Sequence, residues 1–313
     1  MKKRDLLTLS DVSRTEIDQI FSVARRLKRD QKRGVSHLLL SGSTLALLFE
    51  KPSLRTRVSF ETGMAQLGGH AVFLGPDEVQ LGVRESPSDC ARSLSRWVDV
   101  IVVRTFSQGV LEEIAGSASV PVINGLTDLH HPCQVLADCF TLLEHKGKLD
   151  GLKIAFVGDG NNMVHSWMQA AVKFPFSFVV ACPKGYEPDA EITRSAKESG
   201  GRIQITRRVE EAVRGADVLY TDVWTSMGQE SEAEIRRKAF KGYQLDEALV
   251  AMADRHAVVM HCLPAHRGEE ITHEVLESPR SIVFDQAENR LHVQKAILVW
   301  MLKGTKGSRS KKT

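Results

Sequence analysis

The sequence predicts an α/β protein of two domains, each a parallel sheet flanked by helices. Short apolar runs that suit buried strands alternate along the chain with amphipathic stretches that suit helices, and this alternation is typical of βαβ units. The chain has 313 residues, which is long for one hydrophobic core and suits two. A long apolar helix near the middle of the chain is the expected connector between the domains.

The expected elements divide the chain into four parts. The first domain spans 1–147 and includes the connector helix at about 133–145, the second spans 148–287, a C-terminal helix covers 288–304, and 305–313 form a disordered basic tail. In the first domain we expect helices near 9–28, 54–67, 88–97 and 110–118, and strands near 44–49, 70–74, 99–105 and 120–126. The strands of the second domain are expected near 153–157, 177–182, 202–206, 217–223, 257–263 and 281–285.

The composition is that of an ordinary soluble globular protein. Charged residues make up 26% of the chain and hydrophobic residues 42%, and the net charge of +3 gives no footprint for nucleic acid. Five cysteines, an odd number without a C-x-x-C pair, argue against a disulfide framework and a zinc site and fit a reduced cytosol. No apolar segment suits an export signal or a membrane span. We therefore expect a cytoplasmic protein without a nucleic-acid or membrane partner.

The stretch from Phe49 to Glu61 predicts an anion site at the start of a helix. An apolar strand ends at Phe49, and Ser53 stands where the N-cap of the following helix belongs. The first turn of such a helix offers backbone N–H groups and the positive end of the helix dipole to an anion. Arg55 and Arg57 add two permanent guanidinium charges. The alternative is a capped surface helix whose arginines are solvated.

Two further candidates follow later strands of the first domain. Arg104 lies at the end of the run 99–105, and His131 and Gln134 open the connector helix after Leu126. Since ligands collect at the carboxyl ends of parallel strands, this rule brings these residues to the same edge as the 53–57 stretch. His131 then suits donation to a substrate oxygen, and the alternative is a solvated histidine near the helix cap. No partner stands at the spacing that a metal site needs.

The loop after the first strand of the second domain invites comparison with a dinucleotide fingerprint. The run 158–163 reads G-D-G-N-N-M, so Met163 occupies the position of the third glycine, and the strand at 177–182 lacks the expected ribose-binding acid. An NAD-dependent dehydrogenase is therefore the weaker interpretation. Asn162 suits the head group of an amino acid, and the alternative is an ordinary turn.

Two more strand ends in the second domain carry candidates. Asp222 is placed to meet the ammonium group of a ligand, and the run around Gly228 suits a mobile loop that closes over substrate. Cys262 lies at the end of the strand expected at 257–263, where a buried packing residue is the alternative.

Several of these motifs resemble those of the aspartate and ornithine carbamoyltransferase family. The run 53–57, S-L-R-T-R, is similar to the family's S-T-R-T-R signature for carbamoyl phosphate, with Leu54 where threonine is usual. The runs H-P-C-Q at 131–134, S-M-G at 226–228 and H-C-L-P at 261–264 match further family motifs, and Arg290 stands where the family has an arginine. The motifs occur in the expected order over nearly the whole chain.

The resemblance implies transfer of a carbamoyl group from carbamoyl phosphate to the side-chain amine of L-ornithine, giving L-citrulline and phosphate in arginine metabolism. It implies a C-terminal helix that returns to the first domain, no cofactor or metal, and a homotrimer in which Gln80 serves a neighbouring site. The motifs fit the biosynthetic and the catabolic direction equally. A carbamoyltransferase acting on putrescine or N-acetylornithine, and a non-catalytic anion-binding protein, are the alternatives.

The resemblance also assigns roles to individual residues. The implied catalytic residues are Arg104, His131 and Cys262, and the implied ornithine-binding residues are Asn162, Asp222, Ser226 and Met227. The implied contacts of carbamoyl phosphate are Ser53, Leu54 through its backbone, Arg55, Thr56, Gln80, Arg104, His131, Gln134, Cys262, Leu263 and Arg290.

Overall fold

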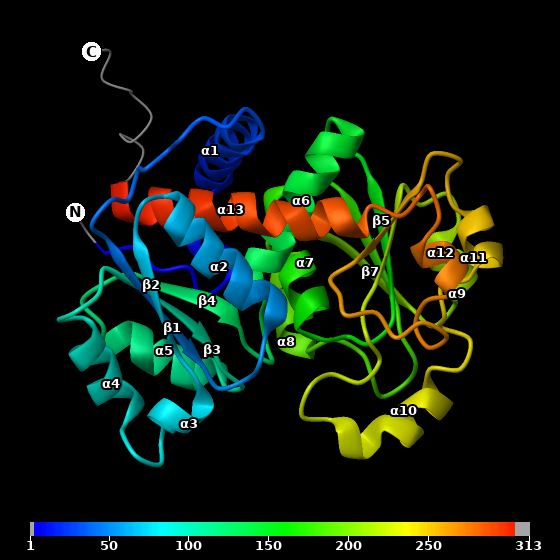
Figure 1. Cartoon of the computed structure of the whole chain (residues 1–313). Helices are drawn as coiled ribbons and strands as arrows, with labels where there is room; N and C mark the ends of the chain where they lie inside the picture. The colour runs from blue at the N-terminus through cyan, green and yellow to red at the C-terminus, as the bar shows by residue number, and fades with distance from the viewer. Residues whose placement is uncertain (1–2, 304–313) are drawn as a thin grey trace. The chain divides into compact units, whose positions relative to one another are not determined.

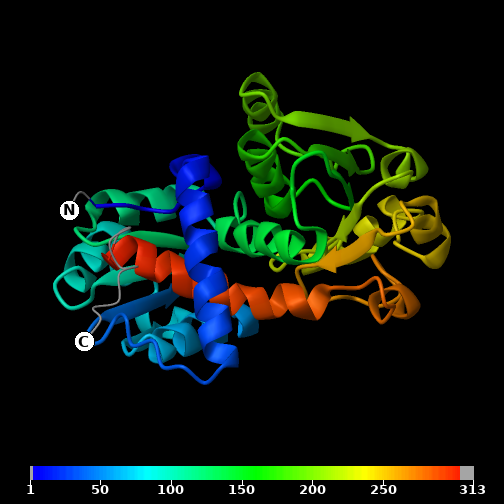
Figure 2. The same ribbon diagram turned by 90° about the horizontal axis from the view of Figure 1, so that it is seen from above.

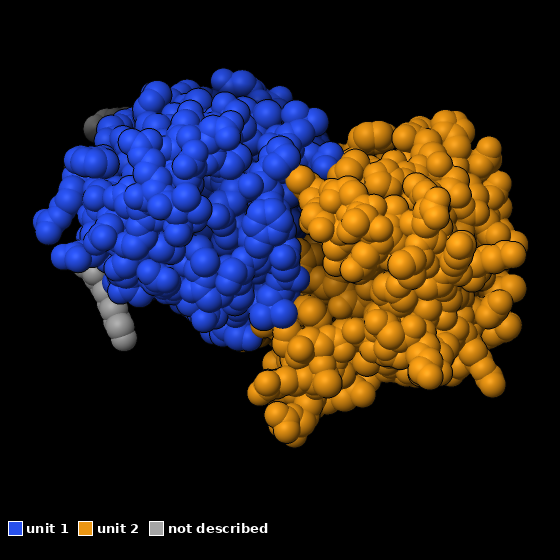
Figure 3. All heavy atoms as spheres, turned by 90° about the horizontal axis from the view of Figure 1, so that it is seen from below, with its two compact units in different colours: residues 1–140, 288–313 blue, residues 141–287 orange. Residues whose placement is uncertain are grey.

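The structure, a computed structural model, describes residues 3–303, and the expected tail at 305–313 lies outside them. The chain divides into two compact units, one of residues 1–140 with 288–313 and one of residues 141–287 (Figure 3). Each unit holds one parallel sheet, which confirms the predicted fold class. Within the described residues, no helix combines the length and apolar character needed to cross a membrane.

The first unit is built on a four-stranded sheet in the order β2-β1-β3-β4. Its strands are β1 (Thr44–Phe49), β2 (His70–Leu74), β3 (Val100–Arg104) and β4 (Val122–Leu126). Two helices, α4 (Pro87–Leu94) and α5 (Gln108–Ser117), bury one face of the sheet in a shared apolar core. Figure 1 shows α2 (Leu54–Gln66), α13 (Val283–Lys303) and α1 (Arg14–Lys32) on the other side.

The second unit is built on a five-stranded sheet in the order β7-β6-β5-β8-β9. Its strands are β5 (Lys153–Val157), β6 (Ser177–Ala181), β7 (Arg202–Thr206), β8 (Val218–Thr221) and β9 (Val258–His261). One face packs on α9 (Val209–Val213), α11 (Glu247–Met252) and α12 (His273–Leu276). On the other face, Trp167 of α7 (Asn162–Lys173) packs against the aromatic rings of Phe178 and Tyr220.

Both sheets contain a point at which the chain reverses its direction of travel across the sheet. In the first, β2 lies on one side of β1 and β3 on the other, and Phe49 is paired with Arg104 at the carboxyl ends of β1 and β3. In the second, β6 and β8 flank β5, and Val157 is paired with Thr221. Ligands of open α/β sheets bind in the crevice that such a reversal leaves. The loops after β1, β3, β5 and β8 are therefore the places to look for a site.

Four more α-helices lie within residues 3–303. They are α3 (Pro76–Val79), α6 (Pro132–Lys146), α8 (Ala190–Glu198) and α10 (Ala233–Ala239). In Figure 2, the long C-terminal helix α13 passes beneath α1 in the first unit. Its part from Glu288 onward belongs to that unit.

The strand expected at 281–285 is wrong, because α13 begins at Val283. Only Ser281 makes a strand-like bridge, to Val259 of β9. The backbone N–H of Gln286 already donates to the carbonyl oxygen of Ile282 at 2.9 Å. The apolar run 282–284 suits a strand in isolation, but it continues without interruption into a pattern of helical spacing, and short apolar runs are ambiguous in this way.

The first helix also differs from the prediction. A 3-10 turn covers Leu9–Asp11, and α1 begins only at Arg14. Ser13 caps α1: its hydroxyl accepts from the N–H of Glu16 at 3.2 Å, and the carboxylate of Glu16 accepts from the N–H of Ser13 at 2.9 Å. This S-x-x-E capping box is the signal that would have placed the start of the helix correctly.

Candidate active site

The N-terminus of α2 follows β1 directly and is capped by Ser53. The hydroxyl of Ser53 accepts from the backbone N–H of Thr56 at 3.2 Å. Thr56 is buried, Arg55 is half-buried, and the Leu54 side chain is 72% exposed. The departure from the family signature therefore falls on a side chain that faces solvent, and the backbone N–H at this position is unaffected by it.

Arg57 belongs to a different surface from Arg55. Its guanidinium lies over the ring of Phe73 at 3.6 Å, and its Nε donates to Glu61 at 3.0 Å. Phe73 is part of the edge strand β2. These contacts give Arg57 a packing role on the outer side of α2, and this difference between two neighbouring arginines provides a matched control for experiments on the anion site.

Arg290 brings three distant segments of the first unit together. It donates to the hydroxyl oxygen of Thr56 at 3.0 Å and to the amide oxygen of Gln134. The amide nitrogen of Gln134 donates in turn to Asp138, one turn further along α6, at 2.8 Å. All four side chains are buried. Helices α2, α6 and α13 are thus joined by a buried polar network at the carboxyl edge of the sheet.

Arg104 adds to the positive character of this edge, and His131 lies beside the same charges. Burial and the neighbouring charges of Arg290 and Arg55 together lower the pKa of Arg104 to about 10, with Asp128 acting in the opposite direction. Burial likewise holds the pKa of His131 well below its usual range, and Arg290, Arg104 and Arg55 act in the same direction. Like charges gathered in a buried place disfavour one another. The arrangement favours a bound anion, whose negative charge compensates for this repulsion.

A buried lysine that was not predicted as a site residue lies at the same edge of the sheet. Lys51, directly after β1, is 3% exposed, donates to Asp128 and lies 3.9 Å from the centre of the Phe106 ring. Phe106 and Asp128 belong to the loops after β3 and β4. Lys51 therefore ties three loops of the crevice together. Its position immediately after a buried strand was the available signal.

Gln80 is exposed and follows α3, with a positive φ of 48°. It differs in this respect from the other candidates in the first unit, which surround the start of α2 and the buried network.

In the second unit, Asp222 follows β8 and is the centre of a small polar cluster. Its carboxylate accepts from the amide nitrogen of Asn161 at 2.8 Å and from the thiol of Cys262 at 2.9 Å. Asp222 is buried and Cys262 is half-buried. The loops after β5, β8 and β9 therefore meet at this carboxylate.

Asn161, the residue before the predicted ligand contact Asn162, makes this bond to Asp222. Its side-chain oxygen also caps α7, accepting from the N–H groups of Met163 and Val164 at 3.0 and 3.4 Å. Asn162 is the first residue of the helix and is half-buried. An asparagine before a helix is a common cap, and this preference was the signal that could have separated the two residues. The residue before them, Gly160, has no room for a side chain, because a Cβ there would lie 2.2 Å from the backbone nitrogen of Pro188.

The segment that carries Cys262 is held by His261. The ring Nδ1 of His261 accepts from the backbone N–H of Leu263 at 2.8 Å, so the ring proton is on Nε2, which donates to Glu270 at 2.9 Å. His261 and Glu270 are fully buried. Leu263 has a φ of 59°, which is unusual for a residue with a side chain. The histidine thus fixes the backbone that orients the Cys262 thiol.

The loop with Ser226 and Met227 leads from Asp222 to α10. Ser226 is half-buried, and the Met227 side chain is 43% exposed. Arg236 of α10 is buried and donates to Asp159 at 2.9 Å and to the carbonyl oxygen of Trp224 at 3.0 Å. Burial nevertheless raises the pKa of Asp159 to about 6, against the effect of Arg236. Arg236 escaped the sequence analysis because nothing in the charged run of α10 distinguishes it from its exposed neighbours.

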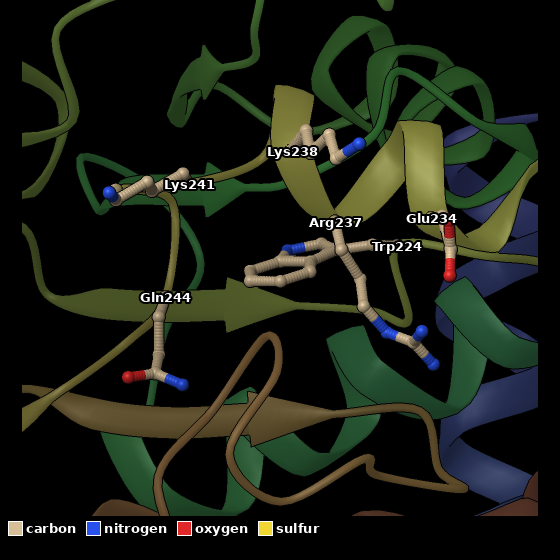
Figure 4. Close-up of a pocket in the computed structure, with 7 residues that line it drawn as sticks. Trp224, Glu234, Arg237, Lys238, Lys241 and Gln244 are labelled. Atoms are coloured by element: carbon tan, nitrogen blue, oxygen red, sulfur yellow. The ribbon is translucent and has the colours of Figure 1, made fainter.

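A cavity of about 690 Å³ is lined by Trp224 and by residues of α10 and the segment after it, and none of the candidate residues lines it. Its lining side chains include Arg237, Lys238 and Lys241 (Figure 4). Arg237 is paired with Glu269 at 2.9 Å. The candidate site is therefore defined by the strand-end loops and not by this cavity.

Comparison with known protein families assigns a separate binding domain to each of the two units. Residues 4–144 match the carbamoyl-P binding domain of the aspartate/ornithine carbamoyltransferases, and residues 150–301 match the Asp/Orn binding domain. The two matches together cover most of the chain. The chain belongs to the aspartate/ornithine carbamoyltransferase family.

Several relatives and solved structures with high sequence identity to this chain are ornithine carbamoyltransferases. The ornithine carbamoyltransferase of Geobacter metallireducens is 54% identical over 301 residues, covering 96% of this chain and 99% of the relative. That of Pyrococcus abyssi is 52% identical over 310 residues, covering 98% of each. Among solved structures, the ornithine carbamoyltransferase of Pyrococcus furiosus superposes with a TM-score of 0.93 at 52% identity, covering 96% of this chain and 98% of that one.

We predict that His131 is neutral in the unliganded protein throughout the range from pH 6 to 8. Because its pKa is lowered from 6.5, protonation is displaced to more acidic solution. An NMR titration of ¹³C-histidine-labelled protein measures this, with His131→Gln to assign the signal. Arg290→Gln should raise the pKa of His131, because one positive charge is removed. A His131 midpoint near 6.5 in the unaltered protein would contradict the prediction.

Proposed function

We propose that this chain transfers the carbamoyl group of carbamoyl phosphate to the side-chain amine of L-ornithine, giving L-citrulline and phosphate. The observation that carries the proposal is the buried network of Thr56, Gln134 and Arg290 beside the capped start of α2. It is supported by the Asp222 cluster in the other unit and by the names of the relatives. The reaction serves arginine metabolism in the cytoplasm and requires no metal or organic cofactor.

The first unit is proposed to bind carbamoyl phosphate. Ser53, Arg55 and Thr56, with the backbone N–H of Leu54, hold the phosphate at the positive end of α2. Arg290 contributes a further guanidinium to the same anion, and Gln134 holds the carbamoyl amide. Guanidiniums suit this task because they grip phosphate oxygens with two bonds each.

The carbonyl oxygen of the carbamoyl group is proposed to receive hydrogen bonds from Thr56, Arg104 and His131. This oxygen gains negative charge as the amine attacks, so donors aimed at it stabilise the transition state more than the bound substrate. Removing one such donor costs on the order of 10²–10³ in rate. The lowered pKa of His131 means that the donor is a neutral imidazole N–H at physiological pH.

The second unit is proposed to bind ornithine. Asp222 meets the α-ammonium group, and Asn162, Ser226 and Met227 hold the same end of the molecule. Cys262 and Leu263, after β9, contact the reacting groups. Asn161 supports this site by orienting the Asp222 carboxylate.

The attacking amine must be neutral, because only then does it carry a lone pair. An alkylamine has a pKa of ~10.4, so the neutral form costs about 4–5 kcal/mol at pH 7. Removal of water from the site lowers this cost by disfavouring the charged form. A C–N bond forms, the C–O bond to phosphate breaks, and the departing phosphate accepts the proton that the amine loses. A dedicated protein base is therefore not needed.

The test of this proposal is formation of ureido product by the purified protein with carbamoyl phosphate and one of four amines: ornithine, N-acetylornithine, putrescine or aspartate. We expect strong preference for ornithine. In that case, Asp222→Asn should raise the KM for ornithine far more than the KM for carbamoyl phosphate. Preference for another amine would retain the phosphate site and overturn the ornithine assignment. No activity with any amine would overturn the proposed reaction.

The two arginines of α2 provide a matched pair for the phosphate site. Arg55→Ala should raise the dissociation constant of carbamoyl phosphate by about 30- to 1,000-fold, because a buried charge pair contributes roughly 2–4 kcal/mol. Arg57→Ala should change it little, since that guanidinium is engaged by Phe73 and Glu61. Isothermal calorimetry on both variants makes the comparison. Equal effects of the two substitutions would remove the assignment of the site to Arg55.

We also propose that the enzyme acts as a homotrimer in which Gln80 contributes to the site of a neighbouring subunit. The exposure of Gln80 supports this assignment, because an exposed residue is accessible to a second chain. Sedimentation equilibrium should give three chains per particle, and Gln80→Ala should weaken carbamoyl-phosphate binding without dissociating them. A catalytically competent monomer would contradict the proposal.

A further inference from the structure

A buried lysine in the first unit lies outside the groups described so far. Lys295 of α13 is fully buried, and its ammonium donates to the side-chain oxygens of Gln31 and Gln66 at 2.7 and 2.8 Å. Its Nζ also lies 3.2 Å from Nε2 of His37. An ammonium has three protons to donate, and these three neighbours are suitably polar. None of them carries a carboxylate.

The contacts of Lys295 connect the helices that build the phosphate site. Gln66 is the last residue of α2, whose first turn holds Thr56, and Lys295 stands five residues after Arg290 on α13. The two helices are therefore joined at two places, by Arg290 with Thr56 and by Lys295 with Gln66. The two places are about 15 Å apart along α2, at 1.5 Å per residue.

Gly63 shows that α2 and α13 approach closely between these two contacts. A Cβ on Gly63 would lie 3.0 Å from Cγ of Lys295 and 3.5 Å from Cδ1 of Leu291. The absence of a side chain thus lets the stem of Lys295 cross α2 and reach Gln66. In Figure 1, α2 and α13 lie next to each other in the first unit.

We propose that Lys295 is a positioning residue for carbamoyl phosphate: its bond to Gln66 fixes the direction of α2 against α13, so that the first turn of α2 stays aligned with Arg290. This inference rests on the proposed function of the first unit. A single contact between two helices lets one pivot about the other, whereas two contacts at opposite ends of α2 prevent the pivot. Small displacements matter here, because a misplacement of 1 Å at a reacting group can cost about 10²-fold in rate.

The chemistry of the cluster also favours a positional role over a stabilising one. Burying an ammonium without a carboxylate partner costs free energy, and an apolar residue of similar size is often the more stable choice. Burial lowers the pKa of Lys295 to about 8, with Asp30 acting in the opposite direction. The other groups that face the ammonium are Gln31, Gln66 and His37. What the ammonium supplies is a fixed link between three helices and the loop after α1.

The two glutamines provide a matched pair of variants. Gln66→Leu removes the bond between α13 and α2, whereas Gln31→Leu removes a bond of nearly the same length between α13 and α1. Both positions are helical, and leucine suits helices as well as glutamine does. If the link to α2 positions the phosphate site, only Gln66→Leu should affect carbamoyl phosphate.

We expect Gln66→Leu to raise the KM for carbamoyl phosphate by about 5- to 10-fold, well below the ~10² of a full 1 Å displacement. The KM for ornithine should not change, and Gln31→Leu should leave both constants unaltered at a similar Tm. Lys295→Met should behave like Gln66→Leu. Equal effects of both glutamine variants, or no effect of either, would overturn the positioning role.

Calorimetric binding of inorganic phosphate to the same variants separates this inference from the proposed reaction. If the wild-type protein shows no carbamoyltransferase activity, the proposed reaction is wrong, but the phosphate affinities of the variants can still be compared. Weaker phosphate binding by Gln66→Leu than by Gln31→Leu would then still support the positioning role. Equal phosphate affinities in an active enzyme would overturn the inference and leave the reaction standing.

Discussion

The first unit depends on a concentration of positive charge beside the start of α2, to which Arg55, Arg104 and Arg290 contribute. Burial and mutual repulsion lower the pKa of Arg104 and of His131 around the start of α2. Arg290 is accommodated in the same place because the side-chain oxygens of Thr56 and Gln134 accept hydrogen bonds from its guanidinium. Asp138, behind Gln134, is the nearest acid in this network and acts through the amide. The protein therefore retains a positive potential that a phosphate dianion can satisfy.

The second unit has the same sheet architecture, but the charge at its strand ends is negative. Both sheets reverse their strand order at one point, and the loops that follow the two strands flanking that point carry the polar groups. In the first unit these loops end in guanidiniums and a helix N-terminus, and in the second they converge on the buried carboxylate of Asp222. A parallel sheet thus supplies the location, and the residues at the strand ends decide which charge is bound.

The sequence predicted the positions of the site better than its contacts. Arg104 is the last residue of β3 and Asp222 directly follows β8, so both could be placed because parallel topology collects strand ends at one edge. The bond between Asp222 and Asn161 was not predicted, since it depends on which residue caps α7. Arg236 and Lys295 were missed because their partners are distant in the sequence. The strand expected at 281–285 failed because a short apolar run fits both a strand and a buried helix.

Burial, together with the charges of Arg290, Arg104 and Arg55, lowers the pKa of His131, and its neutral state bears directly on the proposed catalysis. An imidazolium beside Arg104 and Arg290 would add a further positive charge that binds the phosphate of the substrate before reaction, and such uniform binding does not accelerate the chemical step. A neutral N–H interacts weakly with an uncharged carbonyl oxygen and more strongly as that oxygen becomes negative. On the proposed assignment, burial and the guanidiniums of the phosphate site therefore together hold His131 in the protonation state in which its hydrogen bond favours the transition state over the substrate.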